Sequence, residues 1–168
     1  MSPLPLHPVV VHFPIVLAFL VPIVAAVVAW GIFRDKHQQR SWLLPLSLQV
    51  VVFLTAWLAV QLGEKDEDRV EAFVSEQVLE EHEESGEAFL VCSGVLMLLM
   101  ILPLFIRSRF LPPILAVVSL LGIGMVIPVG HSGGDLVYNH GASMAFQTAP
   151  GQKSIPSAKH RDHDDDDD

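Results

Sequence analysis

Histidine is the residue type in this sequence best suited to chemistry, because neutral imidazole is a common metal ligand and the axial ligand of b-type haem. The chain of 168 residues has eight histidines. Two lie in the segment LHPVVVHFP, one in the acidic run EEHEE, and two in the segment GHSGGDLVYNHG. These five are the candidate cofactor-binding residues: His7, His12, His82, His131 and His140.

The spacing of His7 and His12 limits how they can act together. Five residues on a regular helix rotate the side chain by about 500°, which leaves the two imidazoles about 140° apart. Both therefore cannot easily bind one metal ion, and we expect one ligand and one supporting residue. Pro8 between them suits the first turn of a helix.

The segment Gly130–Gly141 combines glycines with polar groups. Its glycines allow sharp turning and close backbone approach. Asp135 could orient a histidine through the second ring nitrogen, as carboxylates do around metal sites. The same residues also suit a re-entrant turn that caps the last helix, with Ser132 as a turn residue, and the two interpretations are compatible.

Long apolar blocks must position these residues. The chain is 51% hydrophobic with a mean hydropathy of +0.47. Blocks of about 20 continuous apolar residues match the hydrocarbon core of a bilayer and are typical of membrane-spanning helices. We predict an all-α fold, a four-helix transmembrane bundle over residues 1–148. The helices are expected at about 8–33, 42–62, 87–106 and 110–129.

Two further segments flank these helices. In the acidic loop, Val70, Phe73, Val74, Val78 and His82 recur at helical spacing, which predicts a short amphipathic outer helix on the membrane surface or capping the bundle. Residues 149–168 end in HRDHDDDDD and are too polar to bury a core, so we expect a disordered tail.

Charge gives the orientation. The loops after the first and third helices carry the basic residues, and the positive-inside rule assigns these loops to the cytoplasm. The acidic loop and both termini are then outside, which is the periplasm in a bacterium. The five candidate histidines therefore lie at one level near the outer face of a plasma membrane. The net charge of −9 argues against nucleic acid as a partner.

Two segments carry a family resemblance. LHPVVVHFPIVL and GGDLVYNHG resemble the two ends of the domain of unknown function 2231 family, small membrane proteins, mostly bacterial, with four helices. The middle segment, with Gly63-Glu64 and His82-Glu83, is also similar, so the resemblance covers roughly residues 4–145. Some members of this family look as if they are fused to, or encoded among, redox and cytochrome modules. The resemblance therefore implies a haem-associated or electron-transfer role. The matching positions are His7, Pro8, His12, Pro14, His82, Gly134, Leu136, Val137, Tyr138, His140 and Gly141.

Three functions are open. The first is haem b binding and electron transfer, with two histidines from different segments as ligands and a periplasmic redox protein or larger membrane complex as partner. The second is handling of copper, zinc or nickel by nitrogen and oxygen ligands. The third is a cofactor-free assembly subunit of a membrane complex. If the protein handles metal ions, the ligands would come from Glu64, His82, His131, Asp135, His140, His160 and His163.

A hydrolase or transferase is the least favoured class. The sequence has no nucleophile elbow, no HExxH motif and no phosphate-binding loop. We therefore expect a redox carrier or binding protein in contact with the lipid bilayer, and not a catalyst.

Overall fold

A computed structural model describes residues 6–35 and 38–147. Four helical spans in this part are long and apolar enough to cross a membrane, which confirms the predicted four-helix transmembrane fold. The first span consists of α1 (His7–Val10) and α2 (His12–Phe33), and the second of η1 (Gln39–Trp42) and α3 (Leu43–Val70). The third is α4 (Glu76–Phe105), and the fourth consists of α5 (Leu111–Val118) and α6 (Leu120–Tyr138). A short helix, α7 (Met144–Gln147), follows.

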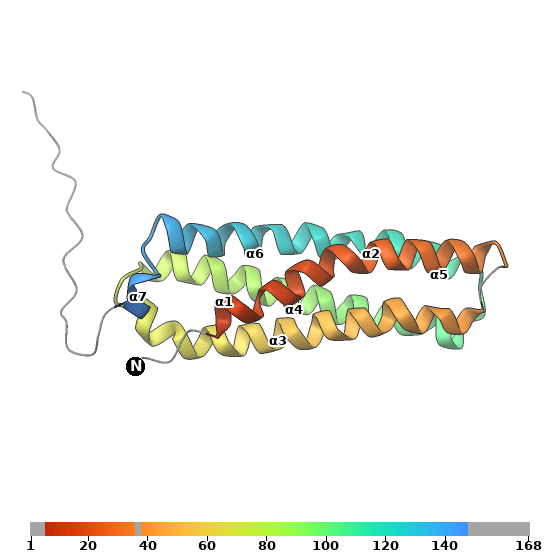
Figure 1. The fold of residues 1–168 in the computed structure, drawn as a ribbon, viewed down its shortest axis with the longest axis horizontal. Helices are drawn as coiled ribbons and strands as arrows, with labels where there is room; N and C mark the ends of the chain where they lie inside the picture. Colours follow the sequence, from red (N-terminus) through yellow and green to blue (C-terminus); the bar gives the residue numbers. More distant parts are fainter. Residues whose placement is uncertain (1–5, 36–37, 148–168) are drawn as a thin grey trace, which may run out of the picture.

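The four spans lie side by side as a bundle (Figure 1). The first span packs against α3 and α5, and α4 packs against α3 and α6. The α2–η1 and α4–α5 connections lie at one end, which we call the arginine end. The α3–α4 turn, α1 and α7 lie at the other, which we call the histidine end. The first and last helices of the described residues, α1 and α7, thus lie at the same end of the bundle.

The helices extend further at the histidine end than hydropathy predicted. The second helix was expected to stop near residue 62, yet α3 continues to Val70. The third was expected to start near residue 87, yet α4 starts at Glu76. Charged residues end the part of a sequence that suits lipid, but Glu, Lys and Arg are good helix formers. The helices therefore continue past the apolar blocks.

The predicted separate outer helix is consequently absent from the described residues. Its residues are divided between the end of α3, a turn over residues 71–75, and the start of α4. Their apolar side chains cap the bundle together with the end of α6 and the segment after it. This outer cluster is Val70, Val74, Leu79, Leu136 and Ala142.

The fourth span also differs from expectation, because α6 continues to Tyr138 instead of ending near residue 129. Gly130, Gly133 and Gly134 are helical, so the segment is not a re-entrant turn. The turn comes later, at Gly141, where φ is +73°. Glycine adopts this left-handed conformation without the steric cost that a Cβ atom brings.

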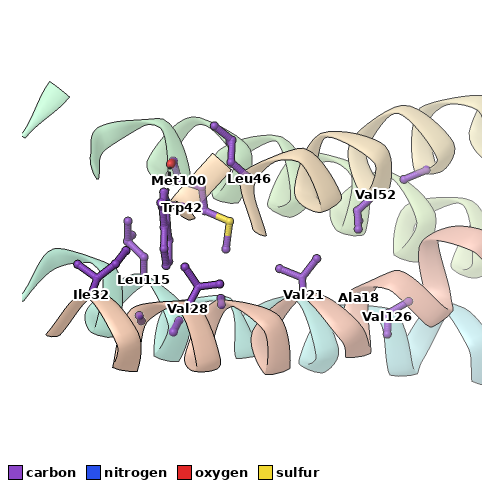
Figure 2. Close-up of a cluster of buried hydrophobic side chains, with 14 of the residues drawn as sticks. Ala18, Val21, Val28, Ile32, Trp42, Leu46, Val52, Met100, Leu115 and Val126 are labelled. Carbon is purple, nitrogen blue, oxygen red and sulfur yellow. Dashed lines mark hydrogen bonds between the residues drawn. The ribbon is translucent and has the colours of Figure 1, made fainter. Parts of the chain in front are cut away.

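The main core lies between the spans toward the arginine end (Figure 2). Trp42 is fully buried, and its indole N–H donates a hydrogen bond to the Met100 carbonyl at 2.9 Å. Many large apolar side chains face outward instead, such as Val27 and Val117. Apolar residues facing lipid gain little by burial, so packing and hydrogen bonds between helices matter more here.

The tail, residues 149–168, lies outside the described residues. So do two of the predicted metal ligands, His160 and His163.

Candidate functional site: a histidine pair

Two of the five candidate histidines meet at the histidine end. His7 is the first residue of α1, and His82 lies in the second turn of α4. Their ring centroids are 6.1 Å apart, and the ring planes are nearly perpendicular at 88°. Both side chains are half-buried. The bundle therefore brings together imidazoles from two segments that are distant in sequence.

The His7 ring is fixed by α3. Its Nδ1 atom lies 2.8 Å from the carbonyl oxygen of Ala59. A carbonyl can only accept a hydrogen bond, so Nδ1 carries the proton and donates it. One turn further along α3, a Cβ atom at Gly63 would lie 3.3 Å from Cε1 and Nδ1 of the same ring. The glycine thus makes room for the imidazole beside the helix.

The His82 ring is fixed in the same way by α6. Its Nδ1 atom lies 2.8 Å from Oγ of Ser132, and that hydroxyl donates to the Val129 carbonyl at 3.2 Å. Because the hydroxyl proton is used there, Oγ accepts the proton on Nδ1. A Cβ atom at Gly133 would lie 3.1 Å from Cε1 of His82. A neighbouring hydrogen-bond acceptor and a glycine again hold one imidazole.

The two anchored rings share a chemical consequence. With Nδ1 protonated, the neutral imidazole has its lone pair on Nε2. Neither Nε2 atom makes a hydrogen bond with any residue that the structure describes. Metal-binding histidines commonly donate their other ring N–H to a carbonyl or similar acceptor, which orients the ring. The pair therefore has the donor chemistry of two ligands to one metal centre.

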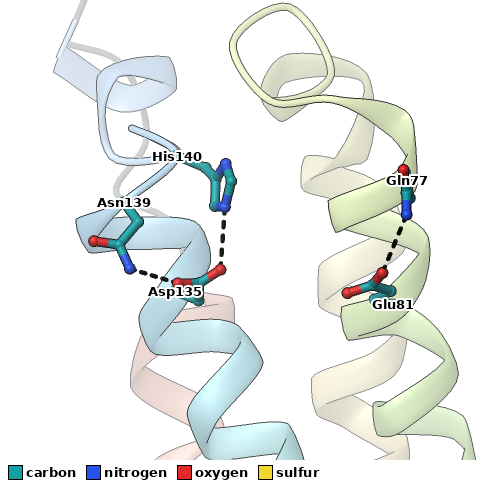
Figure 3. A network of polar contacts seen from close by, with 5 residues as sticks. All are labelled: Gln77, Glu81, Asp135, Asn139 and His140. Atoms are coloured by element: carbon teal, nitrogen blue, oxygen red, sulfur yellow. Dashed lines mark hydrogen bonds and ion pairs between the residues drawn. The ribbon is translucent and has the colours of Figure 1, made fainter.

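The other candidate histidines lie apart from this pair. His12 is exposed, and its Nδ1 bonds only to the Pro8 carbonyl of the preceding turn, at 2.6 Å. His131 is exposed on α6 beside Ser132. His140 follows the end of α6 and folds back so that its Nε2 lies 3.1 Å from Asp135 (Figure 3).

The five predicted metal ligands that the structure describes do not meet as one group. Glu64 is exposed and accepts a hydrogen bond from the Gln61 side chain at 3.0 Å. Asp135 is taken up by His140 and the Asn139 amide (Figure 3). Within residues 6–35 and 38–147, no group of three or more His, Cys, Asp or Glu side chains is placed to hold a metal ion.

Sequence reasoning missed the residues that hold the rings. Ser132 and Gly133 were assigned to a turn, but both are helical and contact His82. Ala59 contributes a backbone carbonyl, which no side-chain pattern can indicate. Glycines inside helices were the available signal, because an isolated glycine in a helical segment often has a packing reason.

Comparisons with known proteins place the chain in a family. A family model described as predicted membrane protein (DUF2231) matches residues 3–145. No curated protein and no solved structure matches the chain. The matched region contains all four membrane spans and both histidines of the pair. The resemblance in the sequence is therefore confirmed: the chain is an integral membrane protein that belongs to the DUF2231 family.

Proposed function

We propose that this membrane protein binds a b-type haem at its histidine end and transfers electrons there. His7 and His82 would hold the haem iron. The observation that supports this is the pair itself: two imidazoles from different helices, 6.1 Å apart, each anchored through Nδ1. The two rings are close enough that a local shift of α1 would let both Nε2 atoms bind one metal ion.

The number of ligands favours haem over a bare metal ion. Protein sites for zinc and similar ions use three or four side chains, whereas haem iron needs one or two from the protein because the porphyrin supplies the rest. The described residues offer a pair of histidines and no larger group. A bound haem would supply one-electron redox chemistry at this end of the bundle.

Small residues and apolar neighbours also suit a flat apolar ring. Ala59, Gly63 and Gly133 line the two imidazoles, and the outer cluster belongs to the same end of the bundle. Because the two rings are in edge contact, entry of the macrocycle requires α1 to move away from α4. A four-residue helix at the start of the described chain is the element best placed to do so.

The orientation belongs to this proposal. The arginine end carries the basic residues of the two short connections, and the histidine end carries the acidic turn between α3 and α4. The positive-inside rule then supports a bacterial plasma membrane with the histidine end, both termini included, facing the periplasm. The electron partner would be a periplasmic redox protein or a larger membrane complex.

The test is the visible absorption spectrum of the full chain purified in mild detergent, with metal analysis of the same sample. We expect a Soret band that is lost in both H7A and H82A. The matched controls are H12A and H131A, which remove histidines at the same end outside the pair and should keep the band.

Three results would overturn the proposal. A Soret band unaffected by H7A and H82A would place any haem elsewhere. Stoichiometric copper, zinc or nickel without a Soret band would favour metal handling. Neither haem nor metal, after expression with an adequate haem supply, would favour a cofactor-free assembly subunit.

A further inference from the structure

A groove runs along the outside of the bundle between α2 and the α5–α6 span, toward the arginine end. Its volume is about 470 Å³, within the range of small-molecule sites. Every residue that lines it is apolar. Small buried residues form its floor, among them Pro22, Ala29 and Ala116, and larger exposed ones form its walls. The groove is thus open toward the surrounding lipid.

Both walls follow helical spacing and end near an arginine. On α2 the wall runs through Ile23, Ala26 and Trp30, and Arg34 follows one turn later on the same face. On the facing span the wall begins at Pro113 in the first turn of α5, and Arg109 lies in the connection just before that helix. Two guanidinium groups therefore stand at the same end of one apolar groove.

Aromatic rings hold these two arginines at the groove. The Arg34 guanidinium lies 5.4 Å from the centre of the Trp30 ring, which is part of the groove wall. The Arg109 guanidinium lies 5.0 Å from the centre of the Phe110 ring and 5.9 Å from that of Phe33. Phe33 stacks on Trp30 at 6.4 Å between ring centres, so the two cations share one aromatic cluster.

No acidic side chain among residues 6–35 and 38–147 forms an ion pair with either cation. Among the described residues, Arg34 and Arg109 form no salt bridge, although Asp35 directly follows Arg34. Ring contacts orient a guanidinium but leave its charge available to an anion. The Arg109 group has five N–H donors in a planar fork that suits phosphate.

We propose that the groove is a binding site for an anionic phospholipid. One acyl chain would lie along the apolar walls, and the phosphate would lie between Arg34 and Arg109. Basic pockets between membrane helices are known to select anionic headgroups. A second copy of the chain fits less well, because a symmetric contact would bring like charges together. The site is independent of the histidine pair and of which leaflet the arginine end faces.

The test uses Trp30 as the reporter, because it lines the groove and is 62% exposed. A W57F background removes the exposed tryptophan of α3, and Trp42 remains as a buried tryptophan that lipid does not reach. The full chain is reconstituted in mixed phosphatidylglycerol and phosphatidylcholine vesicles. One lipid at a time carries brominated acyl chains, which quench tryptophan fluorescence on contact.

We expect brominated phosphatidylglycerol to quench Trp30 more strongly than brominated phosphatidylcholine at matched composition. Each basic residue facing an anionic lipid contributes about 1 kcal/mol, or about fivefold, so two arginines predict a preference of up to about 30-fold. R34Q/R109Q should reduce the preference to about one. R40Q is the matched control, because Arg40 is an exposed cation on η1, which packs against α2, α3 and α4.

Equal quenching by the two lipids in the W57F protein would overturn the proposal. So would a preference that survives in R34Q/R109Q, or one that R40Q removes to the same extent. Protection of Trp30 from both brominated lipids would show that a second copy or another protein covers the groove. Circular dichroism of each variant, with helix content equal to that of the W57F protein, confirms that the comparison is between folded chains.

Discussion

Replacing Gly133 by alanine would place a Cβ atom 3.1 Å from Cε1 of His82. The contact is tighter than carbon atoms normally make, so the imidazole must shift by a few tenths of an ångström. The ring has little freedom to do so, because its Nδ1 is hydrogen-bonded to Ser132 and its other side faces His7. The substitution therefore tests how firmly the site holds this ring.

The expected magnitude is the difference between two opposing effects. Alanine stabilises a helix relative to glycine by about 1 kcal/mol. Overpacking a filled site costs about 1–3 kcal/mol. Gly134→Ala is the matched control, because a Cβ atom there meets nothing within 4 Å and keeps only the helix gain. We expect G133A to be less stable than G134A by about 1–3 kcal/mol.

The assay is equilibrium unfolding in mixed micelles, followed by circular dichroism, for both variants and the parent chain. The comparison between G133A and G134A removes the shared helix effect, because the two positions are adjacent on α6. If G133A and G134A were equally stable, His82 would not occupy the position beside Gly133, and the geometry of the pair would be refuted.

Two further predictions use the same unfolding assay. Ser132→Ala removes the acceptor for Nδ1 of His82 and should lower the free energy of unfolding by about 1 kcal/mol. Ser85→Ala is the control and should lower it less, because the Ser85 hydroxyl bonds only within α4, at 2.8 Å. Equal losses of stability in the two variants would contradict the hydrogen bond between His82 and Ser132. Trp42→Phe removes the indole donor of the Met100 carbonyl in the core and should lower the free energy of unfolding by about 1–3 kcal/mol. An unchanged unfolding midpoint would show that this hydrogen bond does not join η1 to α4.

Hydropathy predicted the number of spans but not where the helices end. A run of apolar residues marks the part that suits lipid, and its end at Leu62 was taken as the end of a helix. The polar residues that follow are good helix formers, so α3 continues to Val70. The same cause extended α4 at its start. It does not apply to the end of α6, where Gly130, Gly133 and Gly134 are poor helix formers; there the helix packs against α4. Local periodicity could not show that the acidic segment turns at residues 71–75.

The sequence predicts at which end of the bundle the histidines lie, but not which side chains they contact. Orientation and helix order placed five of them at one end, and the structure has His7, His12, His82, His131 and His140 there. Which two face one another depends on the rotation of each helix about its axis. That rotation is set by packing between helices, including the space beside Gly63 and Gly133, and no single segment records it.

Within the part of the chain that the structure describes, the proposed metal ligands do not converge as one group, for the same physical reason. Asp135 and His140 are close in sequence and do meet, because the chain folds back after α6. Glu64 and His131 lie at about the same position along the bundle axis as the histidine pair, but each is exposed on its own helix. Sharing a depth in the membrane brings side chains to one plane, whereas coordination requires them to converge on one point.

The length of α4 sets how far the histidine pair stands from the middle of the bilayer. At 1.5 Å per residue, His82 lies about 35 Å along the helix from Phe105, which exceeds the roughly 30 Å of a hydrocarbon core. If Phe105 lies at one boundary of the hydrocarbon core, the histidine pair lies among the lipid headgroups at the opposite boundary. A water-soluble carrier could then touch this end without entering the membrane, and the carboxylates around it would draw positively charged carriers by long-range attraction.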